Sequence, residues 1–412
     1  MSARPDRLGG RNVLVMHPRR HHLYHTALAY RDAGRLAGFL TEVYVGRPGL
    51  LAPLRKLPMA RVANKLSAYH HPELTQYVRV LPAHPALGWL WRALGAATVA
   101  RRGRSWAQVA ADLVRDGHLA LHACCSQAQD AFALCKADGA PCVLEQYLGD
   151  RRAGRQLLLD EFAHWGLPMD EPLIHYLGFS QAKIDINERE YALADSLIAG
   201  SAFVRDTLVA AGVPAERVVL APYGVESDVF TPRFTERRAN EPLRVAFVGT
   251  GGVRKGVLYL LQAAQRLGPQ RVQVHVFGTL LLPEAMLRPY NDILTQHGHL
   301  ARRMLIAELG QCHAMALPSL WEGSAIAVLE AMAMGLPPVV TPNTGSVVRD
   351  GEEGFIVPIR DSDAIAAALT RLADDETARR TMMRRARATA QQQTWAIYGQ
   401  NLVEGLSLAP GR

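Results

Sequence analysis

Residues 244–267, RVAFVGTGGVRKGVLYLLQAAQRL, indicate the fold class of this chain. An apolar run, RVAFVGT, ends in a glycine-rich turn, and an apolar-periodic helix follows the turn at once. A buried strand that turns through glycines into a helix is typical of a parallel α/β unit. Ligands of such sheets bind beyond the carboxyl ends of the strands, so the turn is also the first place to look for chemistry.

The same alternation of strand and helix extends in both directions from this segment. Strands are predicted at 12–18, 41–46, 118–125, 142–148, 196–201, 218–225, 273–279, 313–319, 337–342 and 354–359. Helices are predicted at 23–37, 126–138, 325–334, 362–374 and 376–391. Residues 231–242, TPRFTERRANEP, are polar and bounded by prolines, which is typical of a linker. The sequence therefore predicts an α/β protein with two Rossmann-like, doubly wound domains, at 1–230 and 243–394, facing a cleft.

Length and composition exclude several other classes of protein. With 412 residues, 49% hydrophobic and 20% charged, the chain is neither a disulfide mini-protein nor a disordered tail. Its first residues lack the apolar core of a signal peptide, and the apolar stretch at 81–100 is interrupted by prolines, His84 and Arg92. Five cysteines, without a CxxC pair, predict free and mostly buried thiols in a reducing cytoplasmic compartment.

Positive charge is concentrated near the N-terminus. Residues 1–106 carry 17 Lys and Arg against four Asp and Glu, and the stretch 47–106 carries ten against one. This basic insertion also contains Leu50, Trp89, Trp91 and Trp106. Basic side chains among Leu and Trp suit an anionic membrane surface. A solvated face over ordinary core leucines explains the pattern equally well, and nucleic acid ranks lowest because no recognition motif accompanies the charge.

The glycine-rich turn has the physical properties of a phosphate site. Backbone N–H groups, a helix N-terminus and the side chains of Arg254 and Lys255 all favour an anion there. The turn is not a Walker loop, because Val257 stands where that motif needs Lys. A tight turn with solvated basic residues is an alternative of similar weight.

A second segment, LPSLWEGSAIAVLEAMAMGLP at 317–337, carries two carboxylates on a strand, loop and apolar helix. Glu322 lies in the loop, Ser324 is the predicted N-cap, and Glu330 lies on the helix. A Glu among Ala, Ile, Val, Leu and Met destabilises the fold unless it is satisfied. Glu330 is either a carboxylate at the helix edge, capping a turn or paired with an Arg, or a side chain projecting into a ligand cleft.

The stretch EGSAIAVLE at 322–330, followed by AMAMGLPPVVTPNTGS, resembles the E-x7-E signature of the retaining glycosyltransferases of family 4, also called glycosyltransferase group 1. Residues 188–230, 247–267 and 350–369 resemble further segments of that family in the same order. The resemblance is weak over 1–187, the region that selects acceptors in the family. It implies the GT-B fold, with residues 395–412 as a C-terminal helix that packs back on the N-terminal domain.

The resemblance also implies roles for particular residues. Lys255 and Arg254 would hold the diphosphate of a nucleotide sugar, Glu322 would contact hydroxyls of the transferred sugar, and Glu330 would accept hydrogen bonds from the ribose. Further donor contacts would come from backbone and side chains of the two loops, namely Gly249, Thr250, Gly251, Gly252, Gly323, Ser324 and Ala325. The family uses cations and a helix dipole in place of a divalent metal, so no metal and no cofactor are expected. The triplet Asp361–Ser362–Asp363 is accordingly interpreted as helix capping.

Two departures from the family pattern concern the donor site. Thr250 stands where the family often has Arg, so Arg254 is expected to substitute for it. The strand LALHACC at 119–125 resembles one that supplies a histidine near the sugar, but its second histidine is replaced by Cys124. His122 is therefore either a donor contact or a core histidine.

Four histidines also cluster near the N-terminus, at positions 17, 21, 22 and 25. Spacings of three and four suit a metal on a helix, but no Cys or acidic side chain nearby completes a site. A loop facing the cleft, with His17, His21 and His22 near acceptor or phosphate, is the preferred interpretation.

Together these patterns predict a metal-independent hexosyltransferase (EC 2.4). It would move a sugar from a nucleoside-diphosphate sugar, with retention, to a hydroxyl of a glycan or lipid-linked acceptor for polysaccharide or glycoconjugate synthesis. A cytoplasmic location, with peripheral attachment to the inner face of the cell membrane, is the matching expectation. A nucleotide-sugar epimerase of the same fold and a non-catalytic nucleotide-sugar-binding protein stay open as alternatives.

Overall fold

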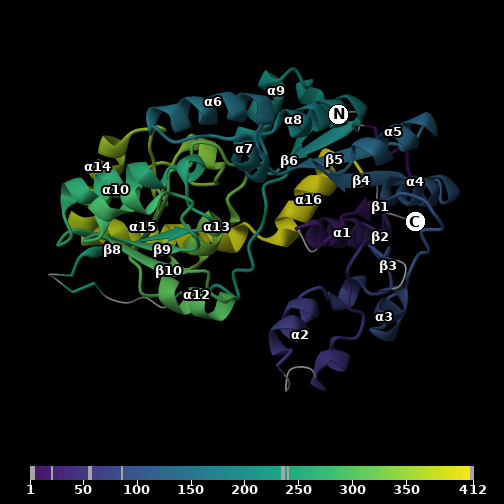
Figure 1. The fold of residues 1–412 in the computed structure, drawn as a ribbon, viewed down its shortest axis with the longest axis horizontal. Coiled ribbons are helices and arrows are strands. Elements are labelled where there is room, and N and C mark those ends of the chain that lie inside the picture. Colours follow the sequence, from purple (N-terminus) through teal and green to yellow (C-terminus); the bar gives the residue numbers. More distant parts are fainter. Residues whose placement is uncertain are drawn as a thin grey trace.

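The computed structural model describes residues 5–19, 22–53, 58–84, 87–232, 237–238 and 241–408. Two parallel sheets, each with helices packed on it, form two domains (Figure 1). Each domain has its own apolar core. The predicted α/β fold with two Rossmann-like domains is confirmed.

The N-terminal sheet has seven strands within the described residues, in the order β3-β2-β1-β4-β5-β6-β7. They are β1 (Val13–Met16), β2 (Leu36–Thr41), β3 (Val78–Val80), β4 (Ala120–Cys124), β5 (Cys142–Gln146), β6 (Ser196–Ala199) and β7 (Val218–Leu220). Its helices are α1 (Leu23–Asp32), α2 (Ala60–Ser67), α3 (Gly88–Ala93), α4 (Trp106–Asp116), α5 (Gln129–Ala137), α6 (Arg151–His164), α7 (Glu171–Leu177), α8 (Gln181–Leu193) and α9 (Ala202–Ala210).

The C-terminal sheet has six strands within the described residues, in the order β10-β9-β8-β11-β12-β13. They are β8 (Leu243–Val248), β9 (Val272–Phe277), β10 (Leu294–Gly298), β11 (Ala314–Leu317), β12 (Pro338–Val340) and β13 (Phe355–Ile356). The helices are α10 (Val257–Leu267), α11 (Glu284–Leu287), α12 (Arg302–Leu309), α13 (Ile326–Ala333), α14 (Ser362–Asp374), α15 (Glu376–Gln392) and α16 (Trp395–Gly405). Asp361 caps α14 by accepting from the Ala364 N–H, which confirms the capping interpretation of the acidic triplet.

One predicted strand was wrong. The sequence indicated a helix over 23–37 and a strand over 41–46, but α1 ends at Asp32 and β2 covers Leu36–Thr41. Gly34 adopts a left-handed conformation with φ 68°, so the chain turns there and the first of two adjacent apolar runs enters the sheet. The second run, at 41–46, leads instead into the basic insertion.

The final helix returns to the N-terminal domain. Helix α16 packs on α1 (Figure 1). Its Tyr398 and Leu402, together with Leu406 directly after the helix, lie in the N-terminal core. The two chain crossings between the domains lie side by side, because the Val225 N–H donates to the Gln393 carbonyl at 3.0 Å. Gly224 is required at this crossing, since a Cβ there would lie 2.2 Å from the Trp395 nitrogen.

Two features of the N-terminal domain depart from a plain doubly wound unit. Helices α2 and α3 of the basic insertion extend beyond the β3 edge of the sheet (Figure 1). Helix α6 reaches toward the other domain, where its buried Glu161 accepts from the Tyr259 hydroxyl at 2.5 Å and pairs with Arg360.

In the part of the chain that the structure describes, no helix combines the length and apolarity needed to cross a bilayer.

Candidate active site

The glycine-rich turn between β8 and α10 presents two cations. A short helical turn, Val253–Lys255, carries Arg254 and Lys255, and Gly256 follows in a left-handed conformation with φ 68°. A Cβ at Gly256 would lie 2.0 Å from the Pro318 carbonyl oxygen, so only glycine lets this loop approach the one after β11. The Leu320 N–H donates to the Arg254 carbonyl at 2.9 Å and fastens the two loops together.

Glu322 lies between these two cations. Its Oε2 is 3.1 Å from Arg254 Nη1 and 3.0 Å from Lys255 Nζ. Burial raises the pKa of this carboxyl, but the charges of Arg254 and Lys255 outweigh burial and lower the pKa to about 2. The structure thus brings together three residues that the sequence placed on two separate loops, and Glu322 is an anion at every physiological pH.

The loop after Glu322 touches the N-terminal domain. A Cβ at Gly323 would lie 1.6 Å from the Tyr147 carbonyl oxygen, and the Gly323 carbonyl accepts from the Ser201 hydroxyl at 2.5 Å. Helix α13 begins at Ile326, so Ser324 is not its N-cap; Ala325 occupies that position without a side-chain hydrogen bond. The backbone of 323–325 is thereby held at the interface of the two domains.

Glu330 faces a different part of the interdomain cleft. It lines a cavity of about 440 Å³ together with residues of both domains, namely His22, Tyr24, His25, His70, His71, Gly224, Val225, Glu226, Arg302, Ile326 and Trp395. Burial raises the pKa of Glu330 to about 7; the Arg302 charge opposes this shift and the Glu226 charge adds to it. Arg302 itself pairs with Glu226.

Glu330→Gln should therefore change stability in a pH-dependent way. A carboxyl with a pKa near 4.5 when unfolded and about 7 when folded is destabilising once it ionises. The free energy of unfolding of the wild type should fall between pH 4.5 and 7, whereas Glu330→Gln should lack this loss and gain roughly 3 kcal/mol at pH 8. Urea unfolding at pH 5 and pH 8 measures it, and an equal difference at both pH values would contradict it.

The predicted histidines have separate positions. His22 lines the cleft cavity, whereas His17 is buried and its Nδ1 contacts the Arg19 carbonyl oxygen at 2.6 Å. His122 is fully buried, with Nδ1 2.9 Å from the Tyr30 hydroxyl and Nε2 2.9 Å from Glu145. Because its side chain is fully buried, the structure favours the core-histidine interpretation of His122 over the donor contact. His21 lies outside the described residues.

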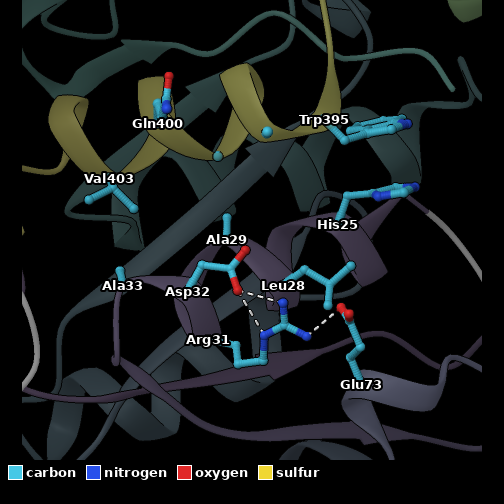
Figure 2. A pocket seen from close by; sticks show the side chains of 12 residues that line it. His25, Leu28, Ala29, Arg31, Asp32, Ala33, Glu73, Trp395, Gln400 and Val403 are labelled. Carbon is cyan, nitrogen blue, oxygen red and sulfur yellow. Dashed lines mark hydrogen bonds and ion pairs between the residues drawn. The ribbon is translucent and has the colours of Figure 1, made fainter. Parts of the chain in front are cut away.

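Two further cavities lie near the cleft cavity, one at the glycine-rich loop and one between α1 and α16. The glycine-rich loop, with Thr250, Gly251, Gly252, Arg254 and Lys255, lines a cavity of about 340 Å³ opposite Tyr176 of α7. Gly249 lies at the loop's start, where a Cβ would be 3.2 Å from Lys255 Nζ. A third cavity, of about 400 Å³, lies between α1 and α16 (Figure 2). Its wall includes His25 stacked on Trp395, with ring centroids 3.9 Å apart, and this pair also borders the cleft cavity.

Sequence reasoning missed several residues of the cleft. Arg302, Glu226, His70 and His71 line the cleft cavity and have no motif. The fully buried Glu145 was also missed, because it lies in a strand that was noted only for its apolar pattern. His70 and His71 show that the basic insertion reaches the cleft.

Within the described residues, no group of three or more His, Cys, Asp or Glu side chains is arranged to hold a metal ion. The five cysteines are free and buried, as predicted.

The arrangement suits an anionic ligand that spans the two loops. Two cations, a glycine turn and nearby backbone provide for phosphate, and carboxylates at Glu322 and Glu330 provide acceptors for hydroxyl groups. Such preorganised charge stabilises negative charge that develops on a phosphate leaving group.

Comparisons with known proteins agree with this chemistry. Residues 242–375 match the family described as glycosyl transferases group 1. The chain is 30% identical, over 192 residues, to the MMP alpha-(1->4)-mannosyltransferase of Mycolicibacterium hassiacum, covering 44% of this chain and 46% of that protein. It is 29% identical, over 183 residues, to the UDP-Gal:alpha-D-GlcNAc-diphosphoundecaprenol alpha-1,3-galactosyltransferase of Escherichia coli, covering 39% and 46%.

In structure, the chain is similar to HepE of Anabaena in complex with UDP, with a TM-score of 0.61, 17% identity and coverage of 96% of this chain and 99% of HepE. At that identity the likeness shows the fold, which is GT-B. The chain spans about half the length of the curated relatives it matches.

Proposed function

Since the chain belongs to glycosyl transferases group 1 through its C-terminal domain, we propose that it transfers a sugar from a nucleoside-diphosphate sugar to an acceptor hydroxyl. The observation that carries the proposal is the pair Arg254 and Lys255, held around Glu322 on a glycine-rich loop. These cations offset the charge that forms on the departing diphosphate. The reaction retains the anomeric configuration and uses neither a divalent metal nor a cofactor.

The donor lies along the C-terminal side of the cleft. Its diphosphate contacts Lys255, Arg254 and the backbone of Gly249–Gly252 and Gly323–Ala325. Its ribose reaches Glu330, whose pKa of about 7 means that a hydrogen bond from a ribose hydroxyl to the carboxylate is favoured above neutral pH. Movement of the two domains about the paired crossings at Val225 and Gln393 would exclude water around the donor.

The acceptor is a glycan or lipid-linked glycan used in polysaccharide or glycoconjugate synthesis. Support comes from two relatives. The name of the Escherichia coli galactosyltransferase includes a diphosphoundecaprenol-linked acceptor, and the similar AmsK of Erwinia amylovora is named as an amylovoran biosynthesis glycosyltransferase. The N-terminal side of the cleft, including His70 and His71 of the basic insertion, is where this acceptor enters.

A thermal-shift panel of nucleoside diphosphates and nucleotide sugars tests the proposal. A ligand at 100 times its dissociation constant adds about 2.7 kcal/mol to the free energy of unfolding, which raises the melting temperature measurably. One base should stabilise the wild type, and product analysis with an acceptor extract should then show a new glycoside. Release of an epimer, or stabilisation without any turnover, would contradict the transferase. Stabilisation by none of the compounds would overturn the donor site itself.

We also propose that the basic insertion attaches the enzyme to an anionic membrane surface on the cytoplasmic side. Its large apolar side chains Leu50, Met59, Val62, Leu87 and Trp89 are exposed, and Trp89 is 64% accessible. Exposed cations at Arg47, Lys65, Arg79, Arg92 and Arg102 accompany them. Leu51 and Trp91, by contrast, are buried and serve the core. Exposed Trp and Leu beside cations suit the boundary between headgroups and acyl chains.

Trp89→Ala is expected to weaken binding to vesicles that contain phosphatidylglycerol. Burying a large apolar side chain contributes about 2 kcal/mol, so the affinity for vesicles should fall roughly thirtyfold. Sedimentation with vesicles measures this affinity. High salt should also release the wild type, because each Lys or Arg contributes about 1 kcal/mol. Tyr176→Ala, an exposed aromatic on α7, is the matched control. Equal binding to neutral phosphatidylcholine vesicles would contradict the electrostatic part of the proposal.

A further inference from the structure

Helix α6 is fixed at its start to the N-terminal domain. Arg151, its first residue, is buried and donates to the Gly178 carbonyl at 2.5 Å and to the Ser126 hydroxyl at 3.1 Å. The same guanidinium donates to the side chain of Asn187 on α8. Because Ser126 follows β4 and α8 packs on β5, the start of α6 is held against the N-terminal sheet.

The other end of α6 is fixed to the C-terminal domain (Figure 1). Glu161 is fully buried, and its Oε1 accepts from the Tyr259 hydroxyl at 2.5 Å and from Trp165 Nε1 at 2.8 Å. Its Oε2 pairs with Arg360. Tyr259 lies in the first turn of α10 and Arg360 lies just before α14, while Phe162 packs in the C-terminal core. Glu161 therefore joins α6 to two elements of the domain that carries the donor loops.

The middle of α6 lies against the donor loops themselves. A Cβ at Gly154 would lie 2.5 Å from Trp321 Nε1, so glycine lets the indole approach the helix. Trp321 directly precedes Glu322, and its carbonyl accepts from Arg254 Nη1 at 2.9 Å. Helix α6 also contacts the short turn Val253–Lys255. The helix thus touches both segments that supply the two cations and Glu322.

The two attachments give α6 the properties of a rigid bridge between the domains. Positions 151 and 161 are separated by about 15 Å of helix. Each attachment contains a buried charged side chain, and releasing either one leaves that charge unsatisfied, which is strongly unfavourable. The chain crossings at Val225 and Gln393 form a separate connection between the domains. With a second connection through α6, the domains have less freedom to rotate than the crossings alone would allow.

We propose that α6 is a bridging helix that sets the position of the glycine-rich loop relative to the N-terminal domain, and that Glu161 is a positioning residue for Arg254 and Lys255. This inference rests on the proposed function. The departing diphosphate meets cations that are already in place, which is the condition for strong electrostatic stabilisation. Because a small displacement of such groups lowers the rate more than it lowers affinity, the contribution of Glu161 belongs to turnover.

The kinetic test compares two variants at the C-terminal attachment. Glu161→Gln keeps an oxygen acceptor for the Tyr259 hydroxyl but removes the charge that pairs with Arg360. Tyr259→Phe removes the hydroxyl on the α10 side and keeps the ring. With UDP-glucose or GDP-mannose, whichever the wild type turns over, kcat should fall about tenfold in Glu161→Gln and about threefold in Tyr259→Phe. In both variants KM should change less than twofold.

Glu353→Gln is the matched control. Glu353 is also fully buried, but it pairs with Arg349 and accepts from the Thr389 hydroxyl at 2.8 Å, all within the C-terminal domain. This variant should leave kcat and KM unchanged, even where it lowers the melting temperature as much as Glu161→Gln does. An unchanged kcat in Glu161→Gln, or an equal loss in Glu353→Gln, would overturn the proposal.

Hydrogen exchange gives a readout that needs neither donor nor acceptor. In the ligand-free protein, amides of residues 250–260 should exchange about fivefold faster in Glu161→Gln than in the wild type, because the loop is less firmly held. Glu353→Gln should leave this segment unchanged. Faster exchange spread evenly over the whole chain of Glu161→Gln would show a purely structural role and overturn the proposal.

Gly154→Ala provides a second route should Glu161→Gln fail to fold. In an unobstructed helix this substitution is stabilising. Here the added methyl group displaces Trp321 and the loop that follows it, so kcat should fall about tenfold while the protein stays folded. Wild-type turnover in a folded Gly154→Ala protein would show that α6 does not position the donor loops.

Failure of this inference is distinguishable from failure of the proposed function. If Lys255→Ala abolishes turnover while Glu161→Gln leaves turnover and the exchange of 250–260 as in the wild type, the donor site stands and only the role of α6 is overturned. If the wild type neither turns over a nucleotide sugar nor shows slower exchange in 250–260 with UDP or GDP, the proposed function is overturned and this inference with it.

Discussion

Replacing Lys255 with Ala should abolish the stabilisation by nucleoside diphosphate and lower turnover of the nucleotide sugar by a factor of 100 to 1,000. Removing one preorganised donor to a developing anion raises the barrier by ~3 kcal/mol. Lys255 is the cleaner of the two cations to remove, because Arg254 also donates to the Trp321 carbonyl at 2.9 Å and so supports the loop.

Lys136→Ala provides the matched control for this experiment. Lys136 forms a surface pair with Asp195 at 2.7 Å, so its removal changes the net charge equally without touching the cleft. Thermal shift with the diphosphate and release of diphosphate from the nucleotide sugar are the two measurements. Undiminished diphosphate binding by Lys255→Ala would show that the glycine-rich loop is not the phosphate site.

The fold was predictable because its signals are local. Most of the β-strands are apolar runs next to a turn residue, and the alternation with helices fixes a parallel arrangement. The edge strands β3 and β10 were not predicted, because β3 has only three residues and β10, LTQHG, is largely polar. The failure at β2 has a local origin as well: Leu36–Thr41 and the following 41–46 are both apolar, and only the left-handed turn at Gly34 decides between them. The paired crossings at Val225 and Gln393 depend on residues far apart in the chain, and no local pattern reports them.

The site was predictable only where a motif carried it. Arg254, Lys255 and Glu322 belong to two recognisable segments, but their ion pairs join positions 67 to 68 residues apart. Glu145 was missed because its strand pattern is apolar and its partners lie at Thr26, His122 and Tyr398. His122 lies in a recognisable motif, but its side chain is fully buried. Its exposure depends on Tyr30 of α1, which contacts it from a distant part of the sequence.

Glu322→Gln should have opposite effects on binding and on turnover. Without a ligand, the carboxylate pairs with both cations that the proposed function assigns to the diphosphate. A bound diphosphate must therefore compete with Glu322 for Arg254 and Lys255. Removing one negative charge beside this site should tighten binding of the diphosphate roughly tenfold, about 1.4 kcal/mol. Turnover should fall 10- to 100-fold, because charge-assisted hydrogen bonds to sugar hydroxyls contribute about 1.5–3 kcal/mol.

A change in net charge could by itself alter the affinity for the diphosphate. The pH dependence of the affinity difference between wild type and Glu322→Gln, together with a control variant, separates this effect from the loss of the two ion pairs. The pKa of Glu322 is about 2, so its carboxylate stays charged at every pH tested. Because a terminal phosphate completes its ionisation near about pH 6, the gain in diphosphate affinity should be constant from roughly pH 7.5 to 9. Glu188→Gln removes a surface carboxylate that pairs with Arg152 and controls for net charge. Calorimetric titration of both variants with the diphosphate gives the affinities. The contradicting results are that Glu188→Gln tightens diphosphate binding as much as Glu322→Gln does, or that Glu322→Gln weakens it. Either result would show that the Glu322 carboxylate does not compete with the phosphate. Its pairing with Arg254 and Lys255 would then only stabilise the loop in the absence of ligand.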